Sequence, residues 1–210
     1  MPTLTMEDDR LILWTIQPRN IWELLKDSGI YRCEPTKSSL LMDGSIPDPS
    51  IVEKYDWLVG QMKERIGPAP KGVTYPVWAW YKHNGEHKKP DLRTARWSYG
   101  TGDEDYACIE FEIADEKVLL SDFDVWHIIL NNGLISETEE EYNQLEEKYD
   151  SLPPTEQTVF KYQNWSRVFN ISPLDNDWIR RGLWVQATVW ELRKADVRAV
   201  RFFRTGKRNK

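Results

Sequence analysis

The segment Leu11–Gln17 (LILWTIQ) decides how the chain begins to fold. Its apolar run up to Ile16 is rich in β-branched and aromatic residues, which indicates a strand. Pro18 suits the first turn of a helix, and Gly29 stands where a left-handed C-terminal cap is expected. The chain is therefore predicted to open with a strand, a turn and a helix of two to three turns.

Further helices and strands are predicted along the rest of the chain. Asp48-Pro49 is typical of a helix start, and the apolar stripe that follows it ends at Gly67-Pro68. Strands are expected at Tyr75–Tyr81, Tyr106–Ile113, Lys117–Leu120, Leu183–Leu192 and Val197–Arg204. Helices with Ser121, Thr138 and Thr155 as caps lie before the last two strands, together with one helical turn from Ser172-Pro173. The third of these helices is expected to turn Val159 and Trp165 inward. This order of elements indicates an α+β fold.

Length and composition predict one globular domain over residues 1–204, with a basic C-terminal tail at 205–210. The chain has 210 residues and 40% hydrophobic residues, and its apolar runs are far shorter than a membrane span. No signal peptide is recognisable, and Cys33 and Cys108 are too few for a disulfide framework, so a cytoplasmic location and buried thiols are expected. The net charge of −6 argues against a general nucleic-acid coat protein.

Familiar catalytic motifs are missing from the sequence. There is no phosphate-binding glycine loop, no nucleophile elbow and no HExxH pair. His83 and His87 are four residues apart, but HNGEHKKP is not helical in character and no carboxylate pair completes a metal shell. No metal site is therefore expected.

Five segments resemble a bacterial and phage family of unknown function, DUF3841. They are Leu13–Gln17 (LWTIQ), Pro76–Trp80 (PVWAW), Lys89–Arg93 (KPDLR), Leu120–Trp126 (LSDFDVW) and Val185–Leu192 (VQATVWEL). This resemblance spans most of the chain, and it implies no particular activity.

A more distant resemblance is to the ADP-ribosyltransferase superfamily, especially its DarT-like and RNA 2′-phosphotransferase-like branches. It lies in the order of the elements and in three short motifs. It implies a split antiparallel or mixed sheet with a central cleft, helices packed around it, and NAD as substrate. Thr15 or Gln17 would hold the nicotinamide ribose, Tyr81 would wall the ring, and Gln186 would stand at the catalytic position of the late strand.

Other residues are candidates for binding NAD beside these. Tyr31 follows the first helix and would line the same cleft, and Trp78 belongs to the aromatic middle strand. Arg93, next to Asp91, suits a phosphate because a guanidinium makes forked hydrogen bonds. The acceptor would be a nucleic acid or a protein. Each residue also has an ordinary alternative: Gln186 can satisfy a buried neighbour, Trp78 can be core, and Arg93 can pin the loop through Asp91.

A second hypothesis is a non-catalytic RNA- or nucleotide-binding module similar to PUA and ASCH domains. The many tryptophans and the basic final strand would then supply stacking and phosphate contacts. The positions of the tryptophans distinguish the two hypotheses. A stacking platform needs exposed rings, whereas a transferase should bury most rings and use a few to line one cleft.

Overall fold

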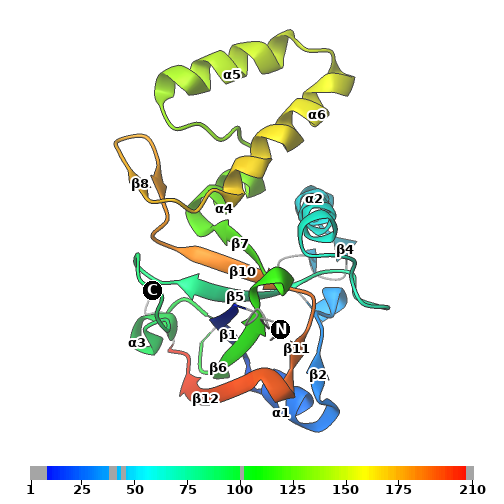
Figure 1. The fold of residues 1–210 in the computed structure, drawn as a ribbon, viewed down its shortest axis with the longest axis vertical. Coiled ribbons are helices and arrows are strands. Elements are labelled where there is room, and N and C mark those ends of the chain that lie inside the picture. Colours follow the sequence, from blue (N-terminus) through cyan, green and yellow to red (C-terminus); the bar gives the residue numbers. More distant parts are fainter. Residues whose placement is uncertain (1–8, 38–41, 44–45, 100–101, 207–210) are drawn as a thin grey trace, which may run out of the picture.

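A computed structural model describes residues 9–37, 42–43, 46–99 and 102–206. Its main strands are β1 (Arg10–Pro18), β5 (Val77–Lys82), β6 (Asp105–Ala114), β7 (Leu119–Asp122), β10 (Val185–Val189) and β12 (Val197–Arg204). They form one sheet in the order β12-β6-β1-β5-β10-β7, and every neighbouring pair is antiparallel (Figure 1). The predicted combination of helices with an antiparallel sheet is confirmed.

Six α-helices accompany the sheet in the described ranges: α1 (Arg19–Ser28), α2 (Pro49–Arg65), α3 (Leu92–Ala95), α4 (Phe123–Leu130), α5 (Glu139–Ser151) and α6 (Pro154–Trp165). Asp48 caps α2 by accepting from the Ser50 amide, and Gly29 ends α1 with φ of 79°, both as predicted. Figure 1 shows α5 and α6 projecting away from the sheet as an arm.

Short antiparallel pairs complete the described structure. They are β2 (Ile30–Tyr31) with β11 (Leu192–Arg193), β3 (Met42–Asp43) with β4 (Ile46–Pro47), and β8 (Leu174–Asp175) with β9 (Arg180–Arg181). The last pair stands where one helical turn was expected after Pro173, so that prediction is wrong. Asn176 explains the turn, since its side chain accepts from the Trp178 and Ile179 amides and closes the loop between the two strands.

Two predicted helix caps are also wrong. Ser121 lies inside β7, opposite Gln186, and Asp122 caps α4 by accepting from the Val125 amide at 3.0 Å. Thr155 lies within α6, which begins one residue earlier with proline in its first turn. At α4 the neighbouring Asp122 provides the cap, whereas α6 has no side-chain cap and starts with Pro154, whose fixed φ suits a first turn.

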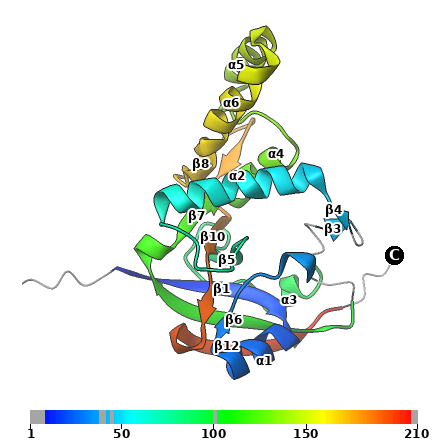
Figure 2. The same ribbon diagram turned by 90° about the vertical axis from the view of Figure 1, so that its right-hand side faces the viewer.

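The two faces of the sheet are covered by different helices (Figure 2). Leu25 of α1 packs with Leu13, Ile109 and Ala187 on one face, here called the α1 face. The opposite face, here called the α2 face, is covered by α2 and α4; there the Tyr55 ring meets Trp78 and Trp126 at centroid distances of 6.0 and 5.8 Å. Because side chains alternate along a strand, strand register assigns each candidate residue to a face.

The end of the chain remains packed beyond β12. Thr205 is 2% exposed, and its amide donates to the Glu104 carbonyl. The Gly206 amide donates to the Arg96 carbonyl. Residues 207–210 of the predicted basic tail lie outside the described residues. No helix in the described part is both long and apolar enough to cross a membrane.

Candidate functional site

The junction between β1 and β5 is the narrowest place in the sheet. The two strands pair only at Trp14 and Trp80, whereas β1 pairs with β6 along nine residues from Arg10 to Pro18. Beyond that one pair β1 continues along β6 and β5 follows β10, so the two strands diverge. The expected split of the sheet therefore exists only as this narrow junction inside one continuous sheet.

A hollow of about 210 Å³ lies where the two strands diverge. It is lined by residues from the end of β1, the start of α1, β2 and the start of β5: Gln17, Pro18, Ile21, Tyr31, Cys33, Glu34, Lys37, Pro76, Val77 and Trp78. We call it the junction hollow. Its volume suits a single ring with its substituents, because sites for drug-sized ligands usually exceed about 300 Å³.

Thr15 and Gln17 form a short hydrogen-bond relay at the edge of this hollow. The buried Thr15 Oγ1 donates to the Trp78 carbonyl at 2.8 Å, so a side chain bridges the strands where the backbone ladder stops. The Gln17 Nε2 donates to Thr15 Oγ1 at 2.9 Å. The relay fixes the orientation of the Gln17 side-chain amide. Because the nitrogen Nε2 faces Thr15, the oxygen Oε1 points away from Thr15 and can accept a hydrogen bond.

Four ionisable side chains give the junction hollow its chemistry: Tyr31, Cys33, Glu34 and Lys37. Burial raises the pKa of Tyr31 to about 12, with Cys33 and Glu34 adding to the shift, so the phenol stays protonated and can donate. Burial also raises the pKa of the Cys33 thiol, with a further contribution from the Glu34 charge. Glu34 pairs with Lys37 at 2.7 Å on the open side. The hollow therefore combines an apolar wall with a carboxylate.

Four of the residues proposed from the sequence are thus brought together. Gln17, Tyr31 and Trp78 line the junction hollow, and Thr15 holds Gln17 from behind. Glu34 was not predicted from the sequence. Cys33 was expected to be a buried thiol, but it is partly exposed and lines the hollow. Both follow Tyr31 within three residues, and this closeness in sequence was the available signal.

Gln186 lies on the opposite face of the sheet from Thr15. In the register Gln186 stands opposite Trp80, and Trp80 stands opposite Trp14, so these three side chains share the α2 face. Thr15 follows Trp14 and stands opposite Ile109, whose side chain belongs to the α1 face. The predicted catalytic set therefore does not surround one ligand.

The Oε1 atom of Gln186 is buried and has no hydrogen-bond partner in the described part of the chain, and the same holds for the Oγ of Ser121 opposite it. The Gln186 oxygen therefore satisfies no buried neighbour among the described residues.

Tyr81 and Arg93 lie outside the junction hollow. Tyr81 is the extra residue of a bulge between β5 and β10, and its ring packs on His87 at a centroid distance of 4.6 Å. Arg93 pairs with Asp91 at 3.0 Å while 91% of its side chain is exposed. Asp91 caps α3 at the same time, as in the alternative in which this pair pins the loop.

A family model described as a domain of unknown function, DUF3841, matches residues 12–198. The chain belongs to the DUF3841 family. The matched segment contains most of β1 and all of the other residues that form the junction hollow. No curated protein and no solved structure matches the chain.

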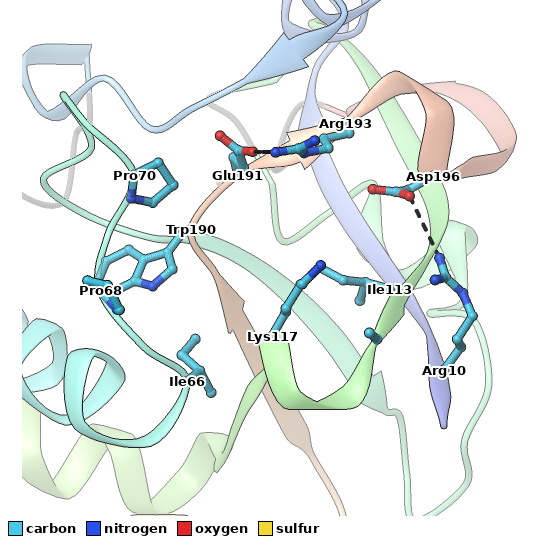
Figure 3. Close-up of a pocket in the computed structure, with 11 residues that line it drawn as sticks. Arg10, Ile66, Pro68, Pro70, Ile113, Lys117, Trp190, Glu191, Arg193 and Asp196 are labelled. Carbon is cyan, nitrogen blue, oxygen red and sulfur yellow. Dashed lines mark hydrogen bonds and ion pairs between the residues drawn. The ribbon is translucent and has the colours of Figure 1, made fainter. Parts of the chain in front are cut away.

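A separate hollow of about 370 Å³ is lined by several charged side chains (Figure 3). Its charges largely satisfy one another: Arg193 pairs with Glu191 at 2.6 Å, and Arg10 approaches Asp196 at 3.7 Å. Lys117 extends its amine toward the middle of the hollow (Figure 3). None of the residues proposed from the sequence lines it, and Lys117 is the lining charge for which no ion pair is found among the described residues.

The two histidines of the β5–α3 loop have separate contacts. His87 Nε2 lies 2.8 Å from the Ile12 carbonyl, and the His83 ring packs edge-on against Trp184. Among the described residues of the DUF3841 domain, no group of three or more histidine, cysteine or acidic side chains is placed to hold a metal ion.

Proposed function

We propose that this DUF3841 domain binds NAD and that the junction hollow receives the nicotinamide–ribose end. The observation that carries the proposal is the convergence of Thr15, Gln17, Tyr31 and Trp78 at the one place where the central strands diverge. The sequence pattern predicts the same four residues as candidates for NAD binding. The hollow takes one ring, so the adenosine half would lie outside it.

The chemistry of the lining fits a ring that carries a carboxamide. The Gln17 Oε1 accepts a hydrogen bond from the carboxamide nitrogen, because its own Nε2 is already engaged by Thr15. Tyr31 and Trp78 are the aromatic residues of the lining, and the Trp78 ring is held from the α2 face by Tyr55 and Trp126. Glu34 is the one carboxylate of the lining, and in this proposal it accepts from a ribose hydroxyl while it keeps its ion pair with Lys37.

The reaction that fits this arrangement is transfer of ADP-ribose. The bond between C1′ of the ribose and the nicotinamide nitrogen breaks, and nicotinamide leaves with the electron pair. A nucleophile of the acceptor, a nucleic acid or a protein, then forms the new bond at C1′ and gives up its proton. A nearby carboxylate stabilises the positive charge that develops on the ribose, and Glu34 takes this role in our proposal, in place of Gln186.

The tryptophans favour a cleft over an open stacking surface. Large exposed hydrophobic side chains in the described part include only two of the 11 tryptophans, Trp97 and Trp178, and these lie on separate elements. Five others, Trp14, Trp57, Trp126, Trp165 and Trp190, are buried. The PUA- or ASCH-like hypothesis needs exposed rings side by side.

Calorimetric titration of NAD tests the proposal. We expect saturable binding that Gln17→Ala weakens about tenfold and Thr15→Val weakens by a similar factor, since each change removes one link of the relay. Gln163→Ala, an exposed glutamine of α6, is the matched control and should leave the affinity unchanged. The absence of binding at about 10 mM NAD, or equal affinity in all variants, would contradict the proposal.

A further inference from the structure

A second hollow, of about 440 Å³, lies beside the carboxyl end of β5, between α3 and the first turn of α4. We call it the aromatic hollow. Its walls include four aromatic side chains, Trp80, Tyr99, Phe123 and Trp184, with His83 and Asp124 as the ionisable groups. None of these six residues lines the junction hollow, so the two sites are separate.

The aromatic rings stand at steep angles to one another. Trp80 and Phe123 have centroids 5.2 Å apart at 50°, and Trp80 and Trp184 are 6.3 Å apart at 72°. The Trp80 Nε1 donates to the Tyr99 hydroxyl at 2.9 Å, which fixes both rings. Rings at such angles form a box, whereas a stacked base needs two parallel rings.

Asp124 gives this box a carboxylate that no lining residue neutralises. Its carboxylate has no hydrogen bond and no ion pair within the described residues. Burial, followed by the charge of Asp122, raises its pKa, and the charges of His127 and Arg180 oppose this shift without cancelling it. Asp122 itself is satisfied, because it accepts from the Val125 and Gly182 amides at 3.0 and 2.6 Å. A guest that neutralises Asp124 would therefore relieve an unfavourable charge.

His83 does not supply the compensating charge. Burial lowers its pKa, the charge of Lys88 lowers it further, and Asp91 opposes these effects. The imidazole is therefore neutral at neutral pH, and its ring packs against Trp184 at a centroid distance of 4.3 Å. The hollow thus offers π faces and one negative charge, with no positive group among its lining residues.

We propose that the aromatic hollow binds a weakly hydrated organic cation, either a methylated ammonium group or an N-alkylated heteroaromatic ring. Such a cation loses little hydration on entry, is attracted by the aromatic faces, and pairs with Asp124. A small metal ion is strongly hydrated and would need several oxygen ligands, whereas the hollow offers it one carboxylate. A neutral ring would leave the Asp124 charge uncompensated.

Ligand-observed NMR with the full chain tests this proposal. The probes are tetramethylammonium and N-methylpyridinium, with neopentyl alcohol and toluene as their neutral counterparts of similar shape. We expect the cations to bind with dissociation constants of about 1 mM. The neutral molecules should bind at least about tenfold more weakly. Asp124→Asn and Trp184→Leu should each weaken cation binding about tenfold.

The controls are Asp150→Asn and Trp178→Leu, which change an exposed aspartate of α5 and an exposed tryptophan of the β8–β9 turn. Tighter binding of tetramethylammonium would assign the hollow to ammonium groups, and tighter binding of N-methylpyridinium would assign it to a cationic ring. Equal binding of the neutral molecules, loss of binding in the control variants, or no binding of either cation at about 10 mM would overturn the proposal.

The cation site does not depend on the proposed NAD function. Asp124→Asn should leave NAD affinity unchanged if NAD occupies the junction hollow, and Gln17→Ala should leave tetramethylammonium binding unchanged. Failure of one proposal therefore leaves the other testable. Loss of NAD binding in Asp124→Asn, with Gln17→Ala unaffected, would instead move the nicotinamide ring, itself a cation, to the aromatic hollow.

Discussion

Replacing Trp165 with alanine is expected to lower the free energy of unfolding by about 4 kcal/mol. The Trp165 side chain is fully buried, and it packs edge-on against Trp57 at a centroid distance of 5.5 Å. Its Nε1 also donates to the Gly133 carbonyl at 2.9 Å, so the substitution leaves a cavity and an unpaired acceptor. Denaturant unfolding followed by circular dichroism measures the change.

Val159 provides the control for this prediction within α6. It was expected to face inward, but 55% of it is exposed, so the sequence-based prediction is wrong for this residue. Val159→Ala should therefore change the free energy of unfolding by less than about 0.5 kcal/mol. A loss from Val159→Ala as large as that from Trp165→Ala would contradict the burial described for α6.

Asp122→Ala is expected to lower the free energy of unfolding by about 3 kcal/mol. The carboxylate is fully buried, and it joins two segments: it caps α4 through the Val125 amide and holds the Gly182 amide just before β10. Its removal leaves two buried donors without their charged acceptor. Gly182 cannot readily adjust, because its φ is 82° and a Cβ there would lie 2.8 Å from Pro173 Cα.

Asp124→Ala is the matched control in the first turn of the same helix. Its carboxylate makes no hydrogen bond or ion pair with another described residue, and its raised pKa means that folding disfavours its charged form. Stability should therefore change by at most about 0.5 kcal/mol, or rise slightly above the pH at which Asp124 ionises. Similar losses of stability for Asp122→Ala and Asp124→Ala would contradict the prediction that only the Asp122 carboxylate stabilises the fold.

Local elements were predictable because their signals are local. LILWTIQ, the Asp48 cap and the Gly29 cap each depend on a few adjacent residues, and all three are found in the structure. The pairing of strands was not predictable in this way. The strands on either side of Asp115–Lys117 are close in sequence, yet β7 lies at one edge of the sheet, four positions from β6.

The last strands illustrate the same limit. β10 and β12 are separated by a short charged segment, yet β12 pairs with β6 at the opposite edge. A pattern of apolar residues identifies a strand and its buried face, but it does not specify which strands pair with it in the sheet. Edge position is decided by the packing of the whole sheet.

The same distinction between local and distant signals applies to the candidate site. Thr15 and Gln17 alternate correctly on one strand, and Tyr31 follows the helix that returns to that strand, so their meeting was predictable from a short stretch of sequence. Gln186 belongs to a strand far away in the sequence, and its face depends on its register with Trp80. A shift of one residue would have placed it on the α1 face.

Protection of Cys33 by NAD is the measurement that tests the central claim most directly. Cys108 is 2% exposed and burial raises its pKa to about 11, so alkylation of the native chain reports on Cys33 alone. The Cys33 pKa is also raised, so its thiolate fraction is small at pH 7 and the labelling rate should increase as the pH rises toward that pKa.

Because Cys33 lines the junction hollow, saturating NAD should slow its alkylation at least about fivefold, and nicotinamide alone should slow it less. Gln17→Ala should restore rapid labelling at the same NAD concentration, with mass spectrometry locating the label. Unchanged labelling of Cys33 while calorimetry registers bound NAD would place the ligand elsewhere and would contradict the assignment of the junction hollow.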